Sequence, residues 1–62
     1  MNKEGIEIFK NQIRVGDELY VGTRDYPYAG TVVDIKDNYF IIDEEGLKSH
    51  IYYCLVWIYS KQ

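Results

Sequence analysis

The chain has 62 residues, seven lysines and arginines against ten acidic side chains, a formal net charge of -3 and one cysteine, Cys54. A domain of this size buries little apolar surface, and one cysteine excludes an intrachain disulfide framework. The acidic balance argues against non-specific binding to duplex DNA, because a phosphate backbone would be repelled.

The length predicts a single domain over residues 1–62, and five short bent strands predict that this domain is a small β-barrel without cofactor or metal. With no disulfide and no visible set of four metal ligands, we expect oligomerisation to provide extra stability. The first residues, MNKEGIEIFK, lack the basic and apolar segments of a signal peptide, and the apolar run 51–58 is too short to cross a bilayer. We therefore expect a cytoplasmic protein, and the free thiol fits a reducing compartment.

The first part of the chain predicts one ambiguous element and one clear strand. Residues 5–9, GIEIF, alternate like a first strand, although a single N-terminal helical turn fits almost equally well. A turn at 15–17 precedes a strand at 18–23, where Leu19 and Val21 share a face.

The middle of the chain predicts a loop followed by a longer strand. Residues 24–28, RDYPY, are expected to form a loop, since proline has no amide hydrogen to donate. In the strand that we expect at 29–36, Val33 and Ile35 share one face and Val32 lies on the other.

The rest of the chain predicts short strands separated by tight turns. Gly46 is free to adopt a positive φ in the second of these turns, and we expect a kink around Cys54 that separates the last two strands. The expected elements are a turn at 36–38, a strand at 39–43, a turn at 44–47, and strands at 48–53 and 55–60.

The segment 50–59, HIYYCLVWIY, is apolar in both registers of a strand. We expect it to pass from one half of a small closed barrel to the other, so that both faces are covered partly by the barrel. Because the segment has no charge or proline from residue 51 onwards, we also expect a second copy of the chain to cover it. The predicted oligomer interface contains Tyr53, Trp57 and Tyr59, although a core position is equally compatible with Trp57.

A pattern of small and apolar residues in the first half of the chain consists of Gly16, Asp17, Leu19, Val21, Gly22, Gly30, Val32 and Ile35. Its spacing resembles the KOW-type modules, which are SH3-like barrels of ribosomal and transcription proteins. It is also similar to the first half of an Sm-like or Hfq-like barrel. The resemblance implies an all-β fold, a five-stranded SH3-like (Sm-like) barrel whose final strands pair edge to edge between neighbours in rings. The basic residues with which those families grip RNA are absent, and IYYC stands in their place.

No group of side chains predicts catalysis or metal binding. Ser49 and His50 are neighbours on a strand and point to opposite faces, and no acid is placed to orient the imidazole. In an unbroken strand His50 and Cys54 would lie about 13 Å apart, too far to share a metal. The DEEG turn at 43–46 lacks the spaced oxygens of a calcium loop. We therefore predict no catalytic residue and no enzyme activity.

Aromatic residues give the strongest functional signal. Seven tyrosines and one tryptophan exceed what so small a core can bury, so some rings are expected on the surface. Tyr26 and Tyr28 stand in the predicted first loop with Arg24, which could contact a phosphate or carboxylate. These three residues form the predicted ligand site, and the alternative is that the rings close the end of the barrel.

Two functions fit these features. The first is a non-catalytic, homo-oligomeric interaction module that binds a short nucleic acid or nucleotide by stacking on surface tyrosines. The second is an adaptor or inhibitor, possibly encoded by a virus, that presents an acidic and aromatic surface to a partner protein.

Overall fold

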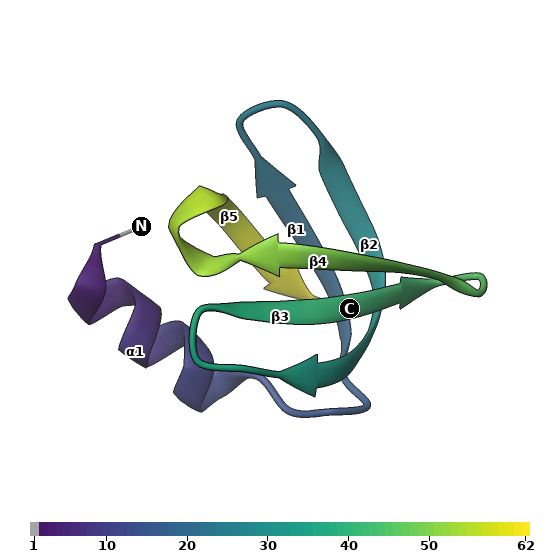
Figure 1. Ribbon diagram of the computed structural model, residues 1–62, viewed down its shortest axis with the longest axis horizontal. Helices are drawn as coiled ribbons and strands as arrows, with labels where there is room; N and C mark the ends of the chain where they lie inside the picture. The colour runs from purple at the N-terminus through teal and green to yellow at the C-terminus, as the bar shows by residue number, and fades with distance from the viewer. Residues whose placement is uncertain (1) are drawn as a thin grey trace.

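The protein, described by a computed structural model over residues 2–62, is built on one antiparallel sheet of five strands in the order β4-β3-β2-β1-β5 (Figure 1). The prediction of an all-β class is confirmed, with one helix added to it. The elements are α1 (Lys3–Gln12), β1 (Glu18–Thr23), β2 (Pro27–Ile35), β3 (Tyr39–Glu44), β4 (Leu47–Tyr52), the 3-10 turn η1 (Tyr53–Leu55) and β5 (Val56–Lys61).

The N-terminal segment is helical, so the strand expected at 5–9 is wrong, and the alternative of a single helical turn was too short. The side chain of Asn2 caps α1 by accepting a hydrogen bond from the Gly5 amide at 2.7 Å. Ile6, Phe9 and Ile13 lie at helical spacing and face the core. A short apolar run has no decisive period, so packing against the sheet decides between helix and strand.

The hairpin of β1 and β2 has the first strand where the sequence predicted it, with Leu19 and Val21 both buried. The loop expected at 24–28 is shorter than predicted, because Pro27 and Tyr28 already belong to β2. Proline is tolerated there because it is the first residue of the strand.

A bulge in β2 corrects the prediction that Val33 and Ile35 share a face, because Val32 and Ile35 both pack in the core. The pairing with β3 shifts between Val32 and Asp34. Val32 is therefore fully buried and Ile35 packs against the core, whereas Val33 is only half-buried. The extra residue of a bulge interrupts the alternation of faces, which a simple period of two cannot predict.

The β3–β4 hairpin closes through a two-residue turn, as the sequence predicted. Glu45 and Gly46 have φ angles of 52° and 90°, so both central residues adopt the left-handed conformation of a tight hairpin turn. Glycine accepts this conformation without a steric penalty.

The segment 50–59 is not one strand, because η1 separates β4 from β5 at the predicted kink. Tyr53 in this turn and Val56 after it lie in the core, while Trp57 and Ile58 remain exposed. The prediction that Tyr53 belongs to an oligomer interface is therefore corrected, since its side chain is only 1% exposed.

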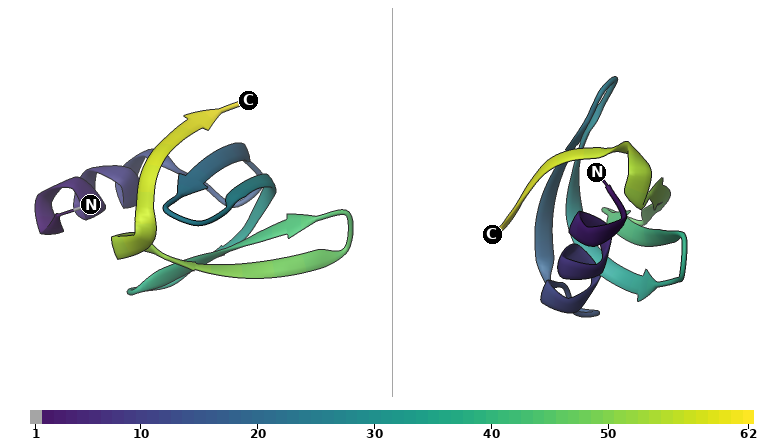
Figure 2. Two further views of the ribbon diagram at one scale, coloured as in Figure 1. Left: turned by 90° about the horizontal axis from the view of Figure 1, so that it is seen from above. Right: turned by 90° about the vertical axis from the view of Figure 1, so that its left-hand side faces the viewer.

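The helix closes the open end of the curled sheet (Figure 2). Phe9, which is fully buried, contacts the rings of Phe40 on β3, Tyr53 in η1 and Tyr59 on β5, at centroid distances of 5.2, 5.9 and 4.4 Å. One side chain of α1 thus joins β3, η1 and the edge strand β5. Within residues 2–62, no helix has the length and apolar character needed to cross a membrane.

Candidate functional site

An open hollow of about 350 Å³ lies on the outer face of the sheet, between β5 and the turn that joins β1 to β2. We call it the Tyr26 hollow. Two residues of the predicted ligand site, Arg24 and Tyr26, lie in it, together with the exposed Trp57. Its lining is Tyr20, Gly22, Thr23, Arg24, Asp25, Tyr26, Pro27, Trp57 and Ile58.

The hollow exists because a glycine and a bulge meet there. Gly22 pairs with Pro27 on one side and with Ile58 on the other, and it contributes no side chain between them. A Cβ at Gly22 would lie 3.0 Å from the Ile58 side chain. Next to this pair the β1–β5 register shifts, so that Thr23 pairs with Val56 and Trp57 is the extra residue of β5. Bulges re-aim side chains, and this one leaves Trp57 68% exposed beside the turn.

The turn that carries Tyr26 is held by three hydrogen bonds between two residues. The Thr23 hydroxyl donates to the Tyr26 carbonyl at 2.7 Å, and the Thr23 amide donates to the same carbonyl at 3.2 Å. The Tyr26 amide donates back to the Thr23 hydroxyl at 3.2 Å. Tyr26 is 57% exposed, and its ring lies 4.9 Å from that of Tyr28. The ring is therefore supported before any ligand arrives.

Tyr28 has a different position from the one predicted. It pairs with Val21 on the inner face of the hairpin, is half-buried, and packs against the core. Its ring packs against the Tyr26 ring, and Tyr28 does not line the Tyr26 hollow.

Arg24 has no ion-pair partner within residues 2–62. The two ion pairs of this part of the chain join Lys36 to Asp34 at 3.2 Å and Lys61 to Asp17 at 3.4 Å. The guanidinium of Arg24 is thus available to an anionic group in the Tyr26 hollow.

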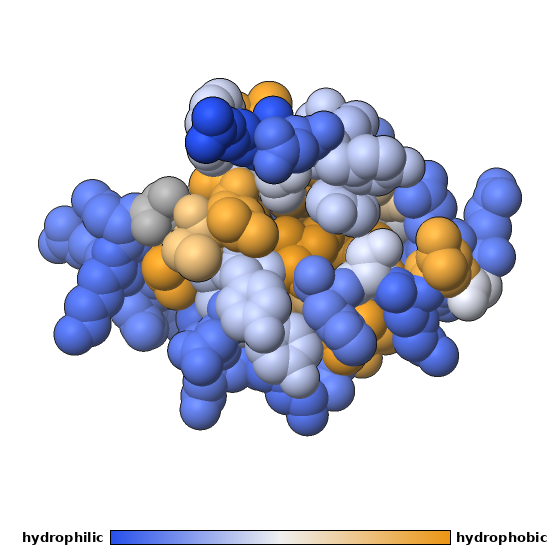
Figure 3. All heavy atoms as spheres, turned by 45° about the horizontal axis from the view of Figure 1, so that its top comes forward, coloured by the Kyte–Doolittle hydropathy of each residue, from blue (hydrophilic) through white to orange (hydrophobic). Residues whose placement is uncertain are grey.

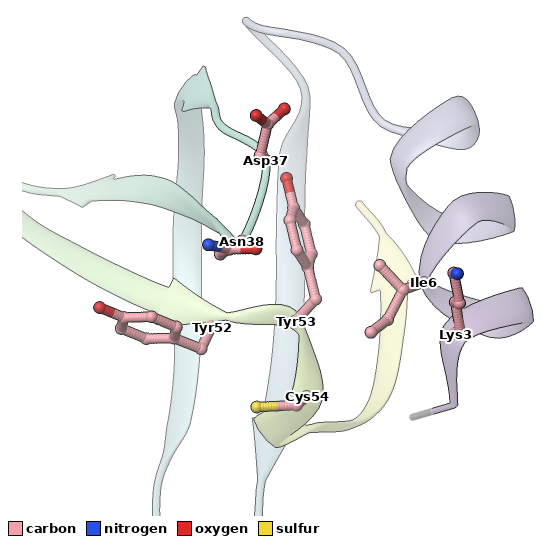
Figure 4. A pocket seen from close by; sticks show the side chains of 7 residues that line it. All are labelled: Lys3, Ile6, Asp37, Asn38, Tyr52, Tyr53 and Cys54. Carbon is pink, nitrogen blue, oxygen red and sulfur yellow. The ribbon is translucent and has the colours of Figure 1, made fainter.

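A second hollow, of about 450 Å³, lies between α1 and the turn before β3 (Figure 4). We call it the Tyr52 hollow. Sequence reasoning missed it because its residues come from three distant segments that only the tertiary fold brings together. Its lining is Lys3, Ile6, Asp37, Asn38, Tyr52, Tyr53 and Cys54.

Tyr53 forms the wall between the Tyr52 hollow and the core. Its hydroxyl donates a hydrogen bond to the Lys36 carbonyl at 2.6 Å, and the Lys10 ammonium lies 5.5 Å from the centre of its ring. Burial raises the pKa of the Tyr53 phenol to about 12, and the negative charge of Asp37 contributes to the shift. In Figure 4 the Tyr53 ring stands between the strands and the helix, while the Tyr52 ring points away from the helix.

The predicted interface residues differ in their accessibility. Trp57 is exposed at the Tyr26 hollow. Tyr59 is half-buried, and its hydroxyl lies 2.7 Å from Oε1 of Gln12. The interface itself stays a prediction, now resting on Trp57 and Tyr59.

Apolar side chains also reach the surface outside the Tyr26 hollow. Figure 3 shows apolar groups surrounded by polar ones on the face that it presents. Exposed apolar residues away from the Tyr26 hollow include Ile8, Val15, Leu47, Tyr52 and Leu55.

The groups considered for catalysis or metal binding lie apart. Among residues 2–62, no three His, Cys, Asp or Glu side chains are arranged to hold a metal ion. The His50 ring is 5.5 Å from the Tyr39 ring on the β3–β4 hairpin, and Cys54 is a free, exposed thiol in η1.

Comparison with known proteins gives no match for this chain, either among protein-family models, among curated proteins or among solved structures.

Proposed function

We propose that the protein is a non-catalytic interaction module of the SH3-like (Sm-like) barrel type, which acts as a homo-oligomer in the cytoplasm and binds a short single-stranded nucleic acid or a nucleotide. Five short antiparallel strands, with bulges in the β2–β3 and β1–β5 pairings, support the barrel. The free Cys54 thiol supports a reducing compartment.

The observation that carries the proposal is the meeting of Arg24, Tyr26 and Trp57 in one open hollow. An aromatic ring offers a base a stacking surface worth about 1–3 kcal/mol, whatever the base. A free arginine beside it supplies a planar pair of donors to a phosphate. Tyr26 and Trp57 thus bind the base, and Arg24 binds a phosphate next to it.

The acidity of the protein limits the length of the ligand. A net charge of -3 gives no extended basic surface, so only the phosphate at Arg24 is neutralised. One neutralised phosphate on a single strand predicts a slope of about -0.7 for the logarithm of the binding constant against the logarithm of salt concentration. Stacking therefore supplies most of the affinity.

Trp57 provides the test, because it is the only tryptophan and it lines the Tyr26 hollow. Titration with a short oligothymidylate is expected to quench its fluorescence. Tyr26→Ala is expected to weaken binding about tenfold or more, and Arg24→Gln to weaken it and flatten the salt dependence. The matched control is Tyr52→Ala, which removes an exposed ring from the other hollow. Equal effects of the two alanine variants, or no quenching at all, would contradict the proposal.

The second candidate is a protein-binding adaptor or inhibitor. It is favoured by the exposed rings of Tyr26, Tyr52 and Trp57 on a chain with a net charge of -3. A partner protein would protect Trp57 from an added quencher such as acrylamide, whereas oligothymidylate would leave its fluorescence unchanged. A saturating oligonucleotide that competes with the partner would favour the first candidate.

A further inference from the structure

One hydrogen bond shows which residues of β5 have backbone groups that point away from β1, at the free edge of the sheet. The Gln62 amide donates to the Glu18 carbonyl of β1 at 2.9 Å. In an antiparallel pair, residues alternate between those bonded to the neighbouring strand and those whose backbone groups point away from it. Because β5 is regularly paired from Ile58 to Lys61, the backbone groups of Tyr59 and Lys61 face away from β1. Trp57 is the extra residue of the bulge, where the alternation is interrupted, so the outward series is assigned for Tyr59 and Lys61.

The two edges of the sheet are not equally protected. β4, at one edge, carries Lys48 and His50, and lysine is a residue that natural proteins use to block an edge strand. β5, at the other edge, has no charged side chain from Val56 to Ser60. Its second half curves to the outside of the molecule in Figure 2. The edge of β5 is therefore the one open to another strand.

We propose that two copies of the chain pair through this edge, β5 antiparallel to β5, with Tyr59 opposite Tyr59 of the second copy. In this register, Trp57 lies opposite Lys61 of the second copy, and Ile58 lies opposite Ser60 of the second copy. The outward backbone groups of Tyr59 in the two copies then bond to one another.

Charge favours a second copy as the occupant of this edge. Two molecules with a net charge of -3 repel one another, so they associate best through a surface without acidic side chains. β5 has none, and Lys61 at its end forms an ion pair with Asp17 of its own chain. The contact uses the same strand in both copies, so it closes at a dimer and does not propagate into a ring.

The pairing also enlarges the ligand site, a consequence that rests on the proposed function. It joins the outer faces of the two sheets, so that the two Tyr26 hollows lie on one continuous surface. Strand spacings of about 4.8 Å and a rise of about 3.4 Å per residue place Gly22 of the two copies about 16 Å apart. A single strand long enough to reach both hollows gains from an intramolecular second contact.

Lys61 allows a test of the dimer that is independent of any ligand. Lys61→Pro removes an amide that faces away from β1, so the barrel keeps its own hydrogen bonds while the new pairing is blocked. Lys61→Ala is the matched control, because it also removes the exposed ion pair with Asp17. In sedimentation velocity at micromolar concentration, we expect a dimer for the wild type and Lys61→Ala and a folded monomer for Lys61→Pro. A monomeric wild type, or a ring of more copies, would overturn the proposal.

Cysteine cross-linking tests the register and does not depend on the proline variant folding. In a Cys54→Ser background, chains with Ile58→Cys are mixed with chains carrying Ser60→Cys under mild oxidation. Residues that face one another across strands lie about 4.5–5.5 Å apart at Cβ, close enough for a disulfide. The mixture is expected to form a covalent dimer several-fold faster than either variant alone. Equal rates would refute this register.

Binding measurements separate this inference from the proposed function. For the wild type, affinity is expected to rise at least tenfold when oligothymidylate becomes long enough to span both hollows, and Lys61→Pro is expected to lose that rise but keep its binding of short oligomers. Short-oligomer binding by a protein that never dimerises would refute the dimer and leave the proposed nucleic-acid binding standing. A cross-linked dimer that binds no oligonucleotide would refute the function and leave the dimer standing.

Discussion

Replacing Tyr53 by phenylalanine measures how much the Tyr53 hydroxyl contributes to the stability of the fold. The ring fills the core in contact with Phe9 and Phe40, and phenylalanine keeps these contacts. What disappears is the hydrogen bond from the hydroxyl to the Lys36 carbonyl. Loss of such a bond costs about 1 kcal/mol at neutral pH, since the carbonyl loses its protein partner.

The same hydroxyl makes the difference in free energy of unfolding between the wild type and Tyr53→Phe depend on pH. The pKa of Tyr53 is about 12 in the folded protein, against about 10 in the unfolded chain. Below pH 10 the phenol is protonated in both states and its full contribution is present. As the pH rises from 10 towards 12, the unfolded chain loses the proton first, so the free energy of unfolding falls by about 1 kcal/mol by pH 11. The wild type thus loses its advantage over Tyr53→Phe near pH 11.

The assay is urea unfolding of the two proteins, followed by circular dichroism at pH 8, 10 and 11. The other tyrosines are common to both proteins, so the difference in free energy of unfolding reports on Tyr53 alone. A difference that stays constant over this range would refute the reasoning, because it would mean that the Tyr53 phenol ionises as in water.

Two further substitutions test the backbone of the fold. Gly30→Ala would force a Cβ against the carbonyl of Asp43, so thermal unfolding is expected to show a loss of about 1–3 kcal/mol. Gly22→Ala, its control, meets only the movable Ile58 side chain and should cost less, and equal losses would contradict this account. Asn2→Ala removes the cap of α1 and is expected to lower the free energy of unfolding by about 1 kcal/mol, measured in urea, while an unchanged value would mean that the cap contributes nothing.

Local chemistry in the sequence was sufficient to predict most of the sheet. The strand at 18–23, the positive φ of Gly46 and the kink around Cys54 each follow from a short pattern that acts over a few neighbouring residues. The helix at the N-terminus did not follow in this way, because Ile6 and Phe9 fit a strand and a helix alike until the open end of the sheet selects the helix.

In the candidate site, too, some residues followed from local sequence and others only from the tertiary structure. Arg24 and Tyr26 were predicted because a proline, an arginine and tyrosines gather within a few residues, which is a local signal. Trp57 joins them only through the bulge against β1, and Tyr53 leaves the surface only through the turn η1. A bulge or a turn shifts every later side chain by one position, and the energy that favours the shift comes from packing between distant strands. The sequence alone therefore determined which residues could bind, and the tertiary structure decided which of them share a surface.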